Sequence, residues 1–169
     1  MASVYEPSPR FYHSSAQVED NAYLWGGLTQ DSNRSEVINI FDSYVEMWKE
    51  QSTTGVPPPG QCAGSFSVVG SNLYYFGGYD GRKYFSSVHE LQLSNLEWNE
   101  IVQSNTAEGP LPKWGGGMVA YQQQLAVIGG YGSAPTGPLQ AGPEFIKNTE
   151  HPECGWNNEF HLFSIREGV

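Results

Sequence analysis

The chain has 169 residues, a length typical of one domain, and its 8 lysine and arginine residues stand against 18 aspartates and glutamates. The net charge of −10 argues against a nucleic-acid-binding surface, which needs clustered basic side chains, and against attachment to an anionic membrane. The 20 glycines, 11 prolines, 10 tyrosines and 5 tryptophans indicate short strands joined by tight turns, so we expect an all-β fold.

The cysteine count and the first residues of the chain indicate the cellular compartment to expect. Two cysteines, Cys62 and Cys154, do not make a disulfide framework. The first residues lack the charged and then apolar pattern of a signal peptide, and no apolar run approaches the ~18 residues of a membrane helix. We therefore expect an intracellular protein, cytoplasmic or nuclear, with reduced thiols.

The first repeat unit begins at Arg10. Its candidate strands cover residues 12–18, 22–25 and 37–41, and a fourth contains Trp48. A short polar link joins the first two strands, which predicts a β-hairpin that ends at the doublet Gly26-Gly27. We expect a four-stranded meander over about 10–52.

The same order of features returns in the second unit, which begins at Gln61. Its candidate strands cover residues 65–69, 73–76 and 88–91, and a fourth contains Trp98. The doublet Gly77-Gly78 follows the first doublet by 51 residues. A second meander is therefore expected over about 61–103.

The third unit begins at Lys113, and its doublet Gly129-Gly130 lies 52 residues after the second. Its candidate strands cover residues 118–121 and 125–128, followed by a long loop over 131–158 and a strand over 160–165. The spacing of the other units would put its outer tryptophan at position 170. The third unit, about 113–169, is therefore expected to lack its outer strand.

Three units of about 50 residues, each with a glycine doublet after the second strand, resemble the kelch family. Tyr79 and Tyr131 follow their doublets as the family's tyrosine does, whereas Leu28 takes this place in the first unit. The resemblance covers nearly the whole chain. It implies a kelch-type β-propeller of three four-stranded antiparallel blades.

Three blades do not close a ring, because propellers typically have about 4–8. We expect a partial propeller, an open ring cut from a longer protein, whose apolar end faces favour self-association. Two alternatives stay open. Either residues 2–6 supply the missing outer strand to the last blade, or two chains assemble into one six-bladed ring.

The glycine doublets and the outer-strand tryptophans are expected to have structural roles. A side chain at the end of the second strand would block neighbouring backbone near the crowded propeller axis, and glycine also allows a positive φ there. Trp48 and Trp98 are expected to cover the seams between adjacent blades, which suits a large amphipathic ring.

The long segments of each unit fall after its second and fourth strands, and these links share one edge of an antiparallel blade. Long loops on a rigid scaffold are where binding residues concentrate, and the kelch resemblance implies the same face. The candidate partner-binding residues are Arg10, Arg34, Tyr79, Arg82, Lys83, Trp114 and Tyr131. Arg82-Lys83 is suited to receive a carboxylate. Arg10 and Lys113 open inner strands and either face the central channel or make buried hydrogen bonds.

The sequence favours binding over catalysis. It has no nucleophile elbow, phosphate loop or dinucleotide fingerprint, and His151 with Cys154 supplies too few ligands for a closed zinc site. We expect a protein-interaction module without cofactor or metal that binds a segment of another protein; the kelch resemblance also implies substrate recognition within ubiquitin ligases. A cytoskeletal, actin-associated scaffold is the alternative, and a kelch-propeller oxidase or sugar isomerase is a remote one.

Overall fold

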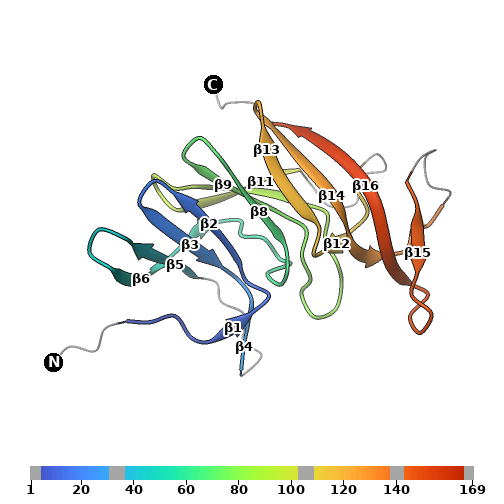
Figure 1. Ribbon diagram of the computed structural model, residues 1–169, viewed down its shortest axis with the longest axis horizontal. Helices are drawn as coiled ribbons and strands as arrows, with labels where there is room; N and C mark the ends of the chain where they lie inside the picture. Colours follow the sequence, from blue (N-terminus) through green and yellow to red (C-terminus); the bar gives the residue numbers. More distant parts are fainter. Residues whose placement is uncertain (1–4, 31–36, 103–108, 138–142, 166–169) are drawn as a thin grey trace.

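The computed structural model describes residues 5–30, 37–102, 109–137 and 143–165. Within these ranges the regular structure is entirely β, and no helix suited to crossing a bilayer is found. Figure 1 shows three twisted sheets side by side in chain order, each built from one stretch of chain. The expected all-β fold with propeller-like blades is confirmed.

The first blade is a four-stranded antiparallel sheet in chain order. Its strands are β2 (Ser14–Val18), β3 (Asn21–Trp25), β5 (Val37–Asp42) and β6 (Met47–Ser52). A short antiparallel pair, β1 (Arg10–Phe11) with β4 (Leu28–Thr29), extends it at the edge where the long loops leave.

The second blade has one more strand than expected. Four antiparallel strands follow in chain order: β8 (Ser65–Val69), β9 (Asn72–Phe76), β10 (Val88–Gln92) and β11 (Glu97–Val102). The linker from the first blade adds β7 (Thr54–Gly55), which pairs in parallel with β11. The amide of Val56 donates to the carbonyl of Trp98 at 2.8 Å, which continues this pairing.

The third blade corrects the expectation of a long loop over residues 131–158. Its strands are β12 (Lys113–Trp114), β13 (Gly117–Tyr121), β14 (Gln124–Ser133), β15 (Phe145–Lys147) and β16 (Cys154–Ser164). Strand β14 continues past its doublet because residues 130–133 pair with 154–157 of β16, with Tyr131 opposite Trp156. Strand β15 pairs with β16 over Gly155–Asn157.

Two apolar seams hold the three blades together. The first joins side chains of blade one to those of blade two: Tyr23, Trp25, Ile38 and Ile40 against Leu73, Tyr75, Leu91 and Trp98. The second joins blades two and three: Tyr74, Phe76 and Val88 against Met118, Leu125 and Val127. Burial of these side chains supplies the main drive for blade packing.

The two outer-strand tryptophans differ. Trp98 is fully buried in the first seam, as expected. Trp48 is only partly buried and stacks on Phe41 of its own blade, with ring centroids 5.2 Å apart. The expectation that Trp48 covers a seam is wrong for the described residues, because Trp48 lies on the face of blade one that no other blade contacts.

The first two glycine doublets lie where neighbouring blades meet, as expected, whereas Gly129-Gly130 lies against backbone of its own blade. The amide of Gly27 donates to the carbonyl of Gln61 at 2.8 Å, and that of Gly78 donates to the carbonyl of Lys113 at 2.9 Å. A Cβ at Gly26 would lie 2.2 Å from the Gln61 carbonyl oxygen, and φ at this residue is +67°. The doublets therefore serve close backbone approach and a left-handed turn together.

The N-terminal segment packs on the first blade. The Tyr5 hydroxyl lies 2.5 Å from the Asn39 side-chain oxygen and 2.8 Å from a Glu50 carboxylate oxygen, and its single proton is shared between these two acceptors. Asn39 corresponds by repeat position to His89, which bonds the linker residue Val56 in blade two. Residues 5–6 thus follow the outer strand of blade one like a linker, so the alternative that the segment supplies an outer strand to the last blade is wrong for these two residues. Residues 2–4 lie outside the described ranges.

Candidate functional site

The candidate site lies on the edge of the blades where the long loops leave, the lower edge in Figure 1. In every blade, the residue after the one that opens the unit pairs with the residue that follows the glycine doublet. The pairs are Phe11 with Leu28, Cys62 with Tyr79, and Trp114 with Tyr131. Four of these six equivalent positions are aromatic, so the repeat itself places rings at this edge.

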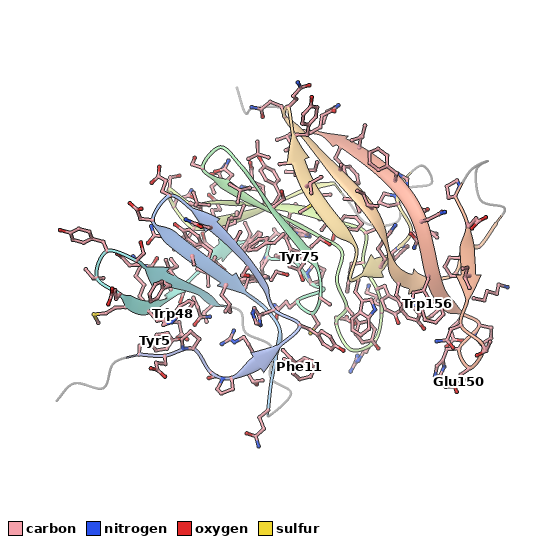
Figure 2. All side chains as sticks on the ribbon, viewed as in Figure 1. Tyr5, Phe11, Trp48, Tyr75, Glu150 and Trp156 are labelled. Atoms are coloured by element: carbon pink, nitrogen blue, oxygen red, sulfur yellow. The ribbon has the colours of Figure 1, made fainter. Side chains whose placement is uncertain are left out.

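These rings and their neighbours form a continuous series across all three blades, here named the aromatic row. Its members, in order, are Phe11, Tyr12, Trp114, Tyr79, Tyr84, Tyr131 and Trp156. Centroids of successive rings lie 4.8–6.1 Å apart. Figure 2 labels the two ends, Phe11 of β1 and Trp156 of β16.

The two ends of the row are exposed and its middle is half-buried. Phe11 is 53% exposed and Trp156 is 52% exposed, whereas Tyr79, Tyr84 and the two rings next to them are partly covered. Aromatic pairs at these distances stabilise one another by about 0.5–1.5 kcal/mol. The rings of the row therefore hold one another in place and still expose ring faces and edges to solvent.

Two of the central rings carry hydroxyls in different environments. The side-chain amide of Asn148 donates to the Tyr131 hydroxyl at 3.0 Å. Burial, followed by the neighbouring Cys154 thiol, raises the pKa of Tyr84, so its hydroxyl keeps its proton at neutral pH. These hydroxyls present hydrogen-bonding groups beside the ring faces.

A basic hairpin tip projects beyond the row. Tyr79 bridges to Tyr84, and the turn between them carries Arg82 and Lys83, both exposed. The Asp80 carboxylate accepts from the backbone amides of Arg82 and Lys83 at 2.8 Å each, which closes the turn. The Lys83 ammonium lies 4.8 Å from the centre of the Phe85 ring.

Arg10 and Lys113 have different environments. The Arg10 guanidinium donates to the carbonyls of Ser8 at 3.1 Å and Gly26 at 3.3 Å. It also borders an open hollow of about 440 Å³ whose lining residues are Glu6, Pro7, Ser8, Arg10, His13, Leu24 and Trp48.

Lys113 is fully buried and does not face the channel. Its ammonium donates to Glu159 at 2.6 Å and to the Asn157 side-chain oxygen at 3.0 Å. Of the two roles left open for Lys113, the structure shows buried hydrogen bonding. The pair ties β12 to β16.

The structure thus brings together part of the expected set. Tyr79, Trp114 and Tyr131 lie in the row, and Arg82 and Lys83 form the tip beside it. Arg34 lies outside the described residues. Sequence reasoning missed four members of the row: Phe11, Tyr12, Tyr84 and Trp156. Phe11 had a usable signal, because it and Trp114 each follow the residue that opens their unit.

Within residues 5–30, 37–102, 109–137 and 143–165, no group of three or more His, Cys, Asp and Glu side chains is placed to hold a metal ion.

Known proteins resemble this chain over most of its length. Kelch domain-containing protein 3 of Bos taurus is 29% identical over 97 residues, which cover 56% of this chain and 25% of that protein. Acyl-CoA-binding domain-containing protein 4 of Arabidopsis thaliana is 29% identical over 125 residues, 73% of this chain and 18% of that protein. The chain therefore spans a quarter or less of these relatives.

A solved structure has a similar fold. The solved structure described as "Structure of YjhT" superposes with a TM-score of 0.63 at 18% identity, over 77% of this chain and 46% of that one. The profile of the KLHDC2/KLHL20/DRC7 Kelch-repeats domain matches residues 2–141. The doublets, the blades and this match together show that the chain belongs to the Kelch-repeat family.

Proposed function

We propose that the chain is a protein-interaction module whose aromatic row binds an extended segment of another protein. Kelch proteins commonly mediate protein binding, and the observation that supports this particular surface is the continuous row of rings across three blades. Aromatic side chains combine large apolar area with few rotatable bonds, which makes them frequent binding hot spots.

The position of the row supports the same proposal. Loops on a rigid scaffold usually carry the binding residues, and here adjacent blades hold the loops in register. The amide of Ala63 donates to the Tyr12 carbonyl at 2.8 Å, and the amide of Gly115 donates to the Ala63 carbonyl at 2.7 Å. These bonds couple the three short extensions that carry the rings, so little ordering remains to be done on binding.

The module acts by binding rather than by catalysis. Within a larger assembly, such as a ubiquitin ligase, the same surface would select the substrate. That role requires the proposed binding surface together with the other subunits or domains of such an assembly.

Selection from a library of random linear peptides displayed on phage tests this function. Recovered peptides should bind the chain and its Tyr44→Ala variant, because Tyr44 is 92% exposed on a turn away from the row. They should lose binding to Trp114→Ala and to Trp156→Ala. Trp156 is half-exposed, so its removal spares the fold. Peptides that bind all four proteins equally, or a selection that recovers none, would contradict the proposal.

A further inference from the structure

We infer that the aromatic row takes a proline-bearing segment in polyproline II conformation, with an acidic residue opposite Arg82. This inference rests on the function proposed above and adds the chemistry of the partner. It is carried by two separate features of the site, the geometry of the rings and the charge of the hairpin tip.

The ring geometry favours prolines. Successive rings are inclined to one another by 33–75°, so they form a corrugated surface and not a flat stack. Grooves between tilted aromatic rings accept the rigid ridges of a polyproline II helix, which has little conformational entropy to lose. The hydroxyl of Tyr131, which accepts from Asn148, can donate its own proton to carbonyls of such a segment, whose backbone makes no internal hydrogen bonds.

The length of the row sets the length of the segment. Five steps of 4.8–6.1 Å, through Tyr12, Trp114, Tyr84 and Tyr131, connect Phe11 to Trp156. At about 3.1 Å per residue, a polyproline II segment of about nine residues is long enough to follow the whole row.

The charge of the tip favours an acidic residue. Arg82-Lys83 is the one place in the sequence where two basic residues are adjacent, in a chain with a net charge of −10. The tip starts directly from the Tyr79–Tyr84 bridge, so its charges lie beside the middle of the row. The planar guanidinium of Arg82 can bind a carboxylate with two hydrogen bonds. Elsewhere the acidic chain repels a carboxylate, so this contact also fixes where the segment sits.

Three synthetic peptides of about nine residues test the inference by titration calorimetry. The first consists of prolines with one central glutamate, the second carries glutamine in its place, and the third keeps the glutamate between glycines and serines. We expect the first to bind saturably, the second about 10-fold more weakly because a charge-assisted bond is lost, and the third at least about 10-fold more weakly.

Variants assign these differences to the site. Arg82→Gln should weaken binding of the glutamate peptide about 10-fold and leave binding of the glutamine peptide unchanged, because the glutamine peptide already lacks the bond that this variant removes. Lys49→Gln removes a similar exposed charge on β6 and should change neither affinity. A third peptide that binds as well as the first, equal effects of Arg82→Gln on the first two, or no binding of the first peptide at millimolar concentration would overturn the inference.

The proposed binding function and the inferred chemistry of the partner can be contradicted independently. Phage peptides that need Trp114 and Trp156 but carry neither prolines nor acidic residues would remove the inference and keep the binding function. Binding of the proline–glutamate peptide that is unaffected by Trp114→Ala and Trp156→Ala would place the ligand elsewhere and remove both.

Discussion

The indole rings of Trp25 and Trp98 lie with their centroids 4.9 Å apart, one from each blade, at the centre of the first seam. Both rings are fully buried. Neither indole N–H has a hydrogen-bond partner among the described residues. The pair therefore holds blades one and two together by apolar contact and stacking alone.

Removal of the Trp98 ring should be costly. Trp98→Ala empties a closed site and should lower the free energy of unfolding by about 3–5 kcal/mol, whereas Trp98→Phe should cost much less because no indole hydrogen bond is lost. Trp48→Ala serves as the matched control, with an expected loss of about 1–2 kcal/mol, since no blade covers that ring. Urea denaturation followed by circular dichroism measures all three. Equal losses for Trp98→Ala and Trp48→Ala would show that the seam does not depend on Trp98.

Acidification should destabilise the second blade through His89. Burial lowers the pKa of His89 below 6.5, while its bond to the Val56 carbonyl and the nearby Glu100 oppose this shift. Below pH 6.5 the unfolded chain takes up a proton that the folded chain resists. Stability should therefore fall by up to about 1.4 kcal/mol per pH unit until the folded pKa is reached.

The variant His89→Asn isolates this contribution, because blade one carries Asn39 at the equivalent position. Between pH 7 and pH 5, its urea midpoint should fall less than that of the unchanged chain. A parallel fall in both proteins would assign the acid sensitivity to other groups.

The buried pair of Lys113 and Glu159 should depend on both partners. Lys113→Met leaves the Glu159 carboxylate buried without its cation and should cost about 3–5 kcal/mol. The double variant Lys113→Met, Glu159→Leu should recover most of this loss, because neither charge then remains unpaired. A double variant no more stable than Lys113→Met in urea denaturation would show that the pair is needed for reasons other than charge.

The repeat let the sequence predict the fold well. Doublets at 51 and 52 residues located the hairpins, and Ser65–Val69 was predicted residue by residue. The errors fall where the repeat is broken. Residues 145–147 and 154–157 became strands because they pair with one another and with the extension of β14, and pairing partners far apart in the chain leave no local signal.

The candidate site was only partly predictable for the same reason. Tyr79 and Tyr131 stood out because they follow glycine doublets. Tyr84 and Trp156 have no counterpart in the other repeat units. Tyr84 reaches the row through the Tyr79–Tyr84 hairpin, and Trp156 reaches it through the pairing of β16 with β14. Whether Lys113 faces the channel or makes buried hydrogen bonds stayed open in the sequence, because its partner Glu159 lies 46 positions later.

The exposed face of blade three should cause self-association. Its large apolar side chains are exposed by 47–65%: Val119, Tyr121, Ile128, Phe160 and Leu162. Ile128 precedes its doublet as Trp25 does, and Trp25 packs into the next blade. In a second copy, the hollow beside Leu24 and Trp48 offers Ile128 the equivalent place.

Light scattering checks this prediction. The mass of the chain should rise with concentration, and further with salt, because salt screens the repulsion between two chains of net charge −10. Phe160→Lys should lower the association. A chain that remains monomeric at all concentrations, or a Phe160→Lys variant that associates as before, would contradict it.

The central claim is that a partner segment lies on the aromatic row, and hydrogen exchange read by mass spectrometry tests it most directly. With a phage-selected peptide bound, exchange should slow in residues 10–13, 79–84, 113–115 and 154–156. It should stay unchanged in the turns at 19–21, 43–46, 70–72 and 122–124, on the opposite edge of the blades. Protection confined to those turns, or spread evenly over both edges, would contradict the account.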